Sequence, residues 1–248
     1  MTAPGWMTAR PIAHRGLHDA AQGVNENSPS AARAAVAGNF GIECDVQLTA
    51  DGEAVVFHDF VLDRLTTASG RVDAHSTAAL GTVEMRGSDE RIPTLPAFLD
   101  VIAGKVPLVL EIKSRFDGDM RLARRVADVV KASPFPIVLK SFDPRIVTAL
   151  KTLTPNHARG IVAMNDYSYP DYETCSATEK HAMANLLHFG ESQPDFVSWR
   201  VRDLPSAAPF LCRRALGLPL MTWTVRNAED RARAEFHADQ MVFEGFVP

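Results

Sequence analysis

Residues 41–47 read Gly41-Ile42-Glu43-Cys44-Asp45-Val46-Gln47, an apolar segment that carries two acids. In an extended strand alternate side chains share a face, so Glu43 and Asp45 point the same way with their Cα atoms roughly 6.6 Å apart. Two carboxylates on one face repel each other. The pair becomes favourable when a hard divalent cation lies between them, because such cations take oxygen ligands. The segment therefore predicts a buried strand that provides part of a metal site.

Two further apolar segments also end in charged or titratable residues. Val109-Leu110-Glu111-Ile112-Lys113 places an acid and a base on one face, and a third segment ends in Ala13-His14-Arg15-Gly16. Acids, histidines and cations at the ends of several strands are typical of the active-site face of a barrel enzyme. The three segments together therefore predict that one end of a barrel carries an active site.

The spacing of short apolar runs predicts eight strands, at 11–14, 41–46, 107–112, 136–140, 159–163, 195–199, 220–224 and 240–244. Several of them are rich in Ile, Val and Leu without alternation, which suits strands buried on both faces of a parallel sheet. Helical patterns lie between them, at 29–37, 94–102, 119–131, 143–150, 206–216 and 227–236, and a further helix is expected within 172–189. Alternating strands and helices predict an α/β fold. Eight strands in 248 residues predict one (β/α)8 TIM-barrel domain over 1–248.

Residues 55–92 interrupt the alternation of strands and helices. An extra strand is expected at 54–57, after the turn Asp51-Gly52, and a polar stretch with several glycines follows it. We interpret this part as a small insertion after the second strand, at about 59–93. It is too short to form an independent domain.

Composition excludes several classes of protein. Hydrophobic residues make up 46% of the chain, which predicts a large core, and the net charge of −4 gives no reason to expect nucleic-acid binding. The chain has no run of about 18 apolar residues, so we expect no transmembrane segment, and its first ten residues have no hydrophobic signal region. Three scattered cysteines fit reduced thiols better than a disulfide framework, which favours a cytoplasmic location.

An ordered set of short motifs resembles the glycerophosphodiester phosphodiesterase family. The matching pieces are His14-Arg15-Gly16, Glu26-Asn27-Ser28, Glu43 with Asp45, Thr49-Ala50-Asp51-Gly52, His58-Asp59, Asp63-Arg64, Ile92-Pro93-Thr94-Leu95, Glu111-Ile112-Lys113, Ser141-Phe142-Asp143 and Thr222-Trp223-Thr224-Val225. The resemblance implies a distorted TIM barrel and metal-dependent hydrolysis of small glycerophosphodiesters to glycerol 3-phosphate and an alcohol. Two departures concern the substrate pocket: Asn25 stands where the family usually has proline, and Phe243-Glu244 stand where it usually has Thr-Asp.

The resemblance also implies a metal site and an acid–base pair. Glu43, Asp45 and Glu111 resemble the family's cation ligands, and oxygen ligands suit Mg²⁺ or Ca²⁺; the alternative for any one acid is a salt bridge within the barrel. His14 and His58 resemble the acid–base pair, because imidazoles accept and donate protons near neutrality. Which histidine starts as the base stays open. So does the nucleophile, which is either a neighbouring substrate hydroxyl that forms a cyclic phosphate or water.

Four further residues are expected at the substrate. Arg15 and Lys113 are predicted to bind phosphate oxygens; the alternatives are a surface cation for Arg15 and a salt bridge to Glu43 or Glu111 for Lys113. Glu26 has two interpretations. It either orients Arg15 or His14 without contacting the substrate itself, or it has no role beyond preceding a helix. Trp223 either forms a wall of the substrate pocket or packs in the core. In addition, Asp59, Asp63 and Arg64 are interpreted as structural pins of the insertion.

Two other functions remain open at this stage. One is a phospholipase-D-like lyase that cuts an intact lipid and stops at a cyclic phosphate. The other is a barrel that binds a phosphorylated ligand without turning it over. Fold alone decides neither, because TIM barrels support many chemistries.

Overall fold

The computed structural model describes residues 3–248, which form two compact units. The first unit contains Ile12–Lys113 and Arg121–Ile137, and the second contains the rest of the described residues. All residues predicted for the metal site, the acid–base pair and the phosphate contacts lie in the first unit. Trp223 lies in the second.

Parallel strands at the centre of the first unit bring the predicted site residues together. Strand β2 (Gly41–Leu48) pairs in parallel with β1 (Ile12–Ala13) on one side and with β4 (Leu108–Ile112) on the other. In this register Asp45 lies beside Glu111, and Ala13 lies beside Ile42. The carboxyl ends of the three strands therefore meet at one edge. The extra strand β3 (Ala54–Val56) runs antiparallel to β2, as expected for the start of the insertion.

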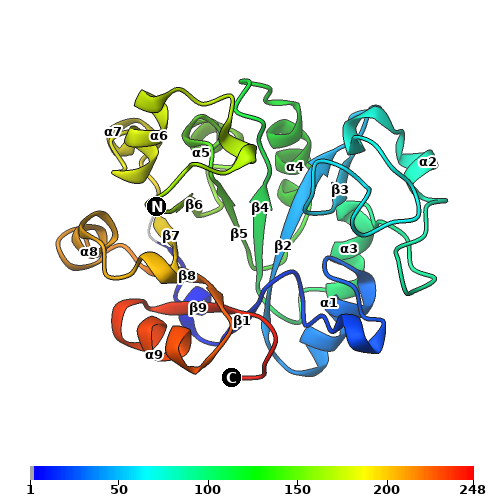
Figure 1. The fold of residues 1–248 in the computed structure, drawn as a ribbon, viewed down its shortest axis with the longest axis horizontal. Helices are drawn as coiled ribbons and strands as arrows, with labels where there is room; N and C mark the ends of the chain where they lie inside the picture. Colours follow the sequence, from blue (N-terminus) through cyan, green and yellow to red (C-terminus); the bar gives the residue numbers. More distant parts are fainter. Residues whose placement is uncertain (1–2) are drawn as a thin grey trace. The chain divides into compact units, whose positions relative to one another are not determined.

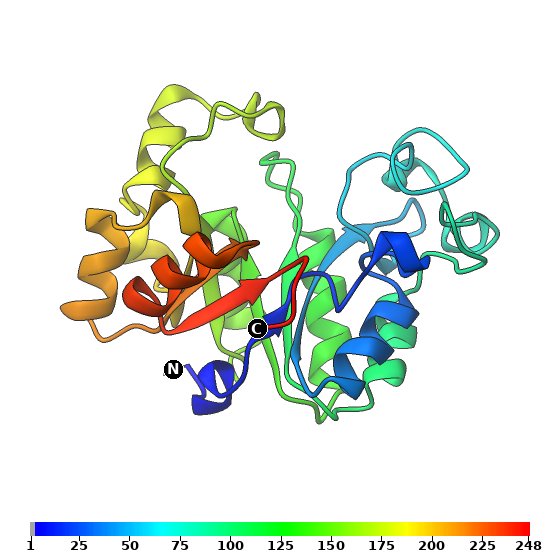
Figure 2. The same cartoon turned by 60° about the horizontal axis from the view of Figure 1, so that its bottom comes forward.

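Three helices pack beside these strands in the first unit (Figure 2): α1 (Pro29–Ala37), α3 (Leu95–Ile102) and α4 (Arg121–Lys131). The hydroxyls of Ser28 and Thr94 accept hydrogen bonds from backbone amides in the first turns of α1 and α3, which begins each helix at the predicted place. Small buried alanines on α1 allow it to approach the sheet closely. The three helices thus cover the strands that carry the predicted site residues.

The insertion has a small core of its own, made of Phe57, Leu62, Val72, Leu80 and Ile92 with Val55. It contains the short helices η3 (Val72–Ala74) and α2 (Thr77–Leu80), which lie beyond β3 (Figure 1).

Two contacts tie the insertion to the first turn of α1 and to the segment before it. Asn25 donates to the carbonyl of Arg86 and to Ser88, and Glu90 accepts from the backbone amide and hydroxyl of Ser30. The first contact gives a role to Asn25, because a proline at this position has no side-chain donor.

The second unit carries five parallel strands that are neighbours in chain order, except that the first residue of β5 belongs to the first unit. The strands are β5 (Ile137–Ser141), β6 (Arg159–Ala163), β7 (Phe196–Arg200), β8 (Leu220–Val225) and β9 (Gln240–Phe243). The helices of this unit are α5 (Pro144–Leu153), α6 (Ala177–Ala184), α7 (Phe189–Ser192), α8 (Ala207–Arg214) and α9 (Ala228–His237). Single 3₁₀ turns occur at Gly5–Thr8, Pro170–Tyr172 and Val201–Asp203, and in the first unit at Ala20–Gln22. None of the helices among residues 3–248 is long and apolar enough to cross a membrane.

Strand positions agree with the sequence prediction, but the first strand is shorter than expected. We predicted 11–14, whereas β1 contains only Ile12 and Ala13. The chain leaves the strand because Arg15 and Gly16 adopt left-handed conformations, with φ of 57° and 80°. Glycine is required at position 16, since a Cβ there would lie 2.8 Å from the Cβ of Ala31. The sharp turn places His14 and Arg15 just beyond the strand end.

Candidate active site

Three buried acids form the centre of the candidate site. Glu43 and Asp45 come from β2 and Glu111 from β4, and each has at most 4% of its surface exposed. One ligand oxygen of each acid lies within 4.8 Å of the others. The strand register explains the cluster, because Asp45 and Glu111 are direct neighbours and Glu43 shares a face with Asp45. The predicted acids are therefore brought together.

Two cations already contact this cluster. The Lys113 ammonium lies 2.8 Å from Oδ1 of Asp45 and 2.7 Å from Oε1 of Glu111, and Nε of Arg15 lies 3.4 Å from Oδ2 of Asp45. Burial alone would raise the pKa of Asp45, but the charges of Lys113, His58 and Arg15 outweigh it and hold that pKa well below its usual range. Lys113 thus forms the salt bridge that was the alternative to phosphate binding, and its partners are Glu111 and Asp45.

Asn27 fixes the orientation of Asp45, a role that sequence reasoning did not assign. Its Nδ2 donates to Oδ2 of Asp45 at 3.0 Å, and its Oδ1 accepts from the backbone amide of Asp45 at 3.2 Å. The residue is fully buried and has a φ of 56°, a conformation that asparagine tolerates better than most residues. Its place in the Glu26-Asn27-Ser28 motif was the one signal in the sequence that could have found it.

The turn after β1 places two predicted residues against Glu43. Nε2 of His14 lies 4.0 Å from Oε2 of Glu43, and the backbone amide of Arg15 donates to the same oxygen at 3.2 Å. His14 is 7% exposed, which leaves it a small opening to solvent. The predicted acid–base residue therefore stands at the edge of the carboxylate cluster.

A chain of ion pairs connects the other predicted residues of the first unit. Nδ1 of His58 lies 2.7 Å from Oδ1 of Asp59, and Nη1 of Arg15 donates to Oε1 of Glu26 at 2.5 Å. Arg64 contacts both of these carboxylates. Glu26 thus touches Arg15 directly, and Arg64 does more than hold the insertion together.

The ion pairs of Glu26 predict how the stability of the fold changes at acidic pH. Burial alone would raise its pKa, but the hydrogen bonds and charges of Arg64 and Arg15 lower it from 4.5 to about 2. A carboxyl group whose pKa is lower in the folded than in the unfolded chain stabilises the fold at pH values above its unfolded pKa, by about 3 kcal/mol for Glu26. This contribution is lost as the pH falls from 4.5 toward about 2. We expect Glu26→Gln to lower the free energy of unfolding at pH 7, and the gap to wild type to shrink at pH 3.

Urea unfolding at the two pH values measures this gap. Glu84→Gln is a matched control, because Glu84 is a surface acid whose side chain is 55% exposed. A Glu26→Gln deficit that is equally large at pH 3 would contradict the stabilising role of the Glu26 carboxylate.

Trp223 lies in the second unit, within a cluster of aromatic side chains. Its indole Nε1 donates to the carbonyl of Ser198 at 3.1 Å, and its ring meets Phe142 edge-on with centroids 5.5 Å apart. The cluster also includes Phe116, Tyr167 and Tyr172. Trp223 remains partly exposed. Its contacts therefore include packing, while one part of the ring stays accessible.

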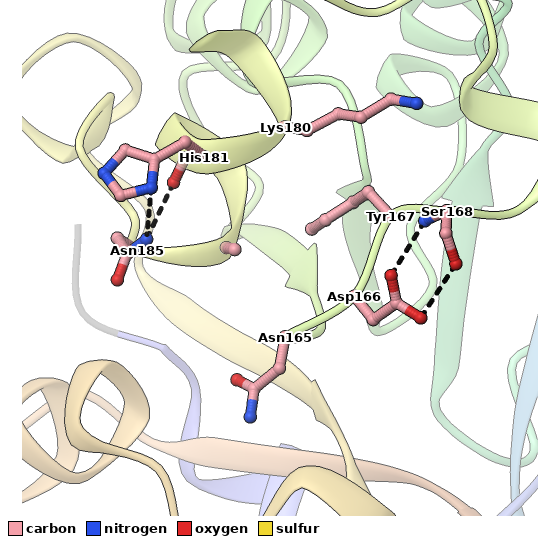
Figure 3. Close-up of a pocket in the computed structure, with 8 residues that line it drawn as sticks. Asn165, Asp166, Tyr167, Ser168, Lys180, His181 and Asn185 are labelled. Carbon is pink, nitrogen blue, oxygen red and sulfur yellow. Dashed lines mark hydrogen bonds between the residues drawn. The ribbon is translucent and has the colours of Figure 1, made fainter. Parts of the chain in front are cut away.

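A separate pocket of about 420 Å³ lies in the second unit between the segment after β6 and helix α6 (Figure 3). Two pairs of its polar groups are hydrogen-bonded to each other: Asp166 accepts from Ser168, and the side chain of Asn185 contacts His181. The remaining lining residues are Asn165, Tyr167, Lys180 and Ala184. The predicted site residues are not among those that line it.

Comparison with known proteins agrees with the motifs and the strand order. Residues 14–242 match the sequence profile of the Glycerophosphoryl diester phosphodiesterase family. A glycerophosphodiester phosphodiesterase of Caldanaerobacter subterraneus is 29% identical over 232 residues, which cover 90% of this chain and 88% of that protein.

Solved structures show the fold. A phosphodiesterase of Oleispira antarctica, determined in complex with the product sn-glycerol-3-phosphate, superposes with a TM-score of 0.77 at 21% identity, over 95% of this chain and 92% of that one. A glycerophosphodiester phosphodiesterase of Thermotoga maritima gives 0.69 at 20% identity, over 94% and 92%. The predicted TIM barrel is confirmed, with β3 as an extra strand on β2. The chain belongs to the glycerophosphoryl diester phosphodiesterase family of enzymes.

Proposed function

We propose that this enzyme hydrolyses small glycerophosphodiesters to glycerol 3-phosphate and an alcohol in a reaction that depends on Mg²⁺ or Ca²⁺. The observation that carries the proposal is the buried cluster of Glu43, Asp45 and Glu111 with His14 at its edge. The family match and the product bound to the Oleispira antarctica phosphodiesterase support the same chemistry.

The donor set fits a hard cation. Three carboxylate oxygens lie within 4.8 Å of one another. An oxygen-coordinated Mg²⁺ or Ca²⁺ holds its ligands within about 4–5 Å of one another, given metal–oxygen distances of about 2.0–2.6 Å. Lys113 and Arg15 offset two of the three negative charges, so the cluster retains an excess of negative charge. Glu43, Asp45 and Glu111 would therefore hold the ion, which would stabilise negative charge on the phosphate oxygens.

Other side chains of the first unit would bind the phosphate, transfer protons and orient the groups that do so. Arg15 offers a planar fork to two phosphate oxygens, and Lys113 offers a point charge to a third. His14 and His58 act on opposite sides of the phosphorus: one imidazole removes a proton from the attacking substrate hydroxyl or water, and the other donates a proton to the leaving oxygen. Asn27 keeps the Asp45 carboxylate in one orientation, and Glu26 does the same for the Arg15 guanidinium.

Three further features complete the proposal. The accessible part of Trp223 would contact the glycerol or the alcohol group, as one wall of the substrate pocket. The whole chain would act as one catalytic domain that includes the insertion. A cytoplasmic location is supported by the three cysteines, all buried and none in a disulfide among the described residues.

Product analysis tests the reaction. We expect phosphorus NMR to show glycerol 3-phosphate as the stable end product when purified protein with Mg²⁺ or Ca²⁺ is incubated with glycerophosphocholine or glycerophosphoethanolamine. A cyclic phosphate that accumulates as the end product, above all from an intact lysolipid, would instead identify a lyase. Tight binding of the diester without turnover would identify a phosphate-binding barrel.

A further inference from the structure

Arg64 uses both edges of its guanidinium group to hold two carboxylates. Toward Asp59, Nε donates to Oδ2 at 2.6 Å and Nη2 to Oδ1 at 2.9 Å. Toward Glu26, Nη1 donates to Oε2 at 3.0 Å and Nη2 to Oε1 at 2.8 Å. Two bidentate pairs on one guanidinium fix the relative positions of both acids, since each pair restricts angle as well as distance.

Each of these carboxylates holds a residue of the proposed catalytic set. Asp59 lies 2.7 Å from Nδ1 of His58, and Glu26 accepts from Nη1 of Arg15 at 2.5 Å. The residues run in one connected order, from Arg15 through Glu26, Arg64 and Asp59 to His58. Arg64 is therefore the residue that joins the Glu26 contact of the proposed phosphate-binding arginine to the Asp59 contact of a proposed acid–base histidine.

We propose that Arg64 is a positioning residue that sets the ring orientation and tautomer of His58 through Asp59 and the guanidinium orientation of Arg15 through Glu26. This inference rests on the function proposed above. A carboxylate that accepts from Nδ1 keeps the proton on that nitrogen, so Nε2 is the atom that exchanges protons with substrate. Without Arg64, the Asp59 carboxylate could rotate and both tautomers of His58 would become populated.

The electrostatics of the pairs support a rigid arrangement. Hydrogen bonds to Glu26 and Asp59 raise the pKa of Arg64. Burial alone would raise the pKa of Asp59, but its hydrogen bonds with His58 and Arg64 lower it, and contacts with Arg64 and Arg15 likewise lower the pKa of Glu26. All three groups are therefore charged at neutral pH. Because the Arg64 side chain is 48% exposed, its ion pairs add little to the stability of the fold. Arg64 matters more because it fixes the positions of Glu26 and Asp59.

Another arginine of the insertion provides a matched control. Arg71 forms a bidentate pair with Asp73, and its side chain is 57% exposed. Its pair with Asp73 lies outside the Arg15–His58 chain. Arg71→Ala removes the same charge and a similar ion pair from the same segment. If Arg64 only held the insertion together, Arg64→Ala and Arg71→Ala should lower kcat by similar factors.

Kinetics of four proteins test the proposal: wild type, Arg64→Ala, Arg64→Lys and Arg71→Ala. We expect Arg64→Ala to lower kcat on glycerophosphocholine by about 10–100-fold, the usual cost of losing a supporting hydrogen-bond partner. Arg64→Lys should recover less than half of this loss on a logarithmic scale, because lysine lacks the planar fork. Arg71→Ala should stay within about twofold of wild type. Millimolar guanidinium should restore part of the Arg64→Ala rate and leave the Arg71→Ala rate unchanged.

Nitrogen NMR of the His58 ring gives a readout that does not need turnover. Wild type should show one neutral tautomer with the proton on Nδ1, and Arg64→Ala should show a mixture. Equal losses in Arg64→Ala and Arg71→Ala, or an unchanged His58 tautomer in Arg64→Ala, would overturn the positioning role. Failure of the wild type to cleave any glycerophosphodiester would overturn the proposed function instead, while the tautomer measurement would still decide the role of Arg64.

Discussion

Replacing either His14 or His58 with alanine should lower kcat by roughly 10²–10⁴, the usual contribution of a positioned acid or base. An in-line displacement at phosphorus removes a proton on one side and delivers a proton on the other. One imidazole cannot readily serve both sides, because the attacking and leaving oxygens lie on opposite faces of the phosphorus. Steady-state kinetics on glycerophosphocholine measure the loss, with circular dichroism as the check that each variant is folded.

The two histidines can be told apart by the leaving group. A p-nitrophenolate needs little protonation as it leaves, so the variant that lacks the leaving-group acid should recover much of its rate on a p-nitrophenyl phosphodiester. The other variant should remain slow on both substrates. Losses in the double variant should be strongly non-additive, because the pair works as a unit. Turnover near that of wild type in either single variant on a natural diester would remove that histidine from the mechanism.

The strands and the acid cluster could be predicted from the sequence because both depend on local periodicity. Glu43 and Asp45 share a face of any extended strand, whatever surrounds it. The neighbouring position of Glu111 follows once the two apolar runs are adjacent parallel strands. The same reasoning placed His14 near the site, although β1 is only two residues long. A left-handed turn at Arg15, which periodicity does not reveal, sets where that strand ends.

Contacts between distant segments were not predictable in the same way. Asn27 and Asp45 are 18 residues apart, and Arg64 and Glu26 are 38 apart, so no local pattern pairs them. Arg64 was therefore interpreted as a pin of the insertion, whereas its two carboxylate partners lead to His58 and Arg15. The partners of Lys113 depended equally on strand register, which places its ammonium between Asp45 and Glu111.

Removal of divalent cations should abolish activity, and Mg²⁺ or Ca²⁺ should restore it. Glu43, Asp45 and Glu111 carry three negative charges in a buried cluster, and Lys113 and Arg15 offset two of them. A phosphodiester adds another negative charge, so repulsion opposes substrate binding beside the cluster unless a metal ion is bound there as well. Activity assays after dialysis against EDTA, followed by addition of each metal, measure this dependence. Full activity in rigorously metal-free protein would contradict it.

Metal binding can be separated from catalysis by thermal unfolding. A ligand that binds only the folded state raises Tm, because the unfolded chain does not present the site. Added cation should therefore raise the Tm of wild type, and Glu43→Gln should reduce the rise, since a neutral amide replaces a ligand carboxylate. Glu235→Gln is the control, because Glu235 is a surface acid that is 54% exposed and paired with Arg231. An equal rise in wild type and Glu43→Gln would mean that the cation binds elsewhere on the protein.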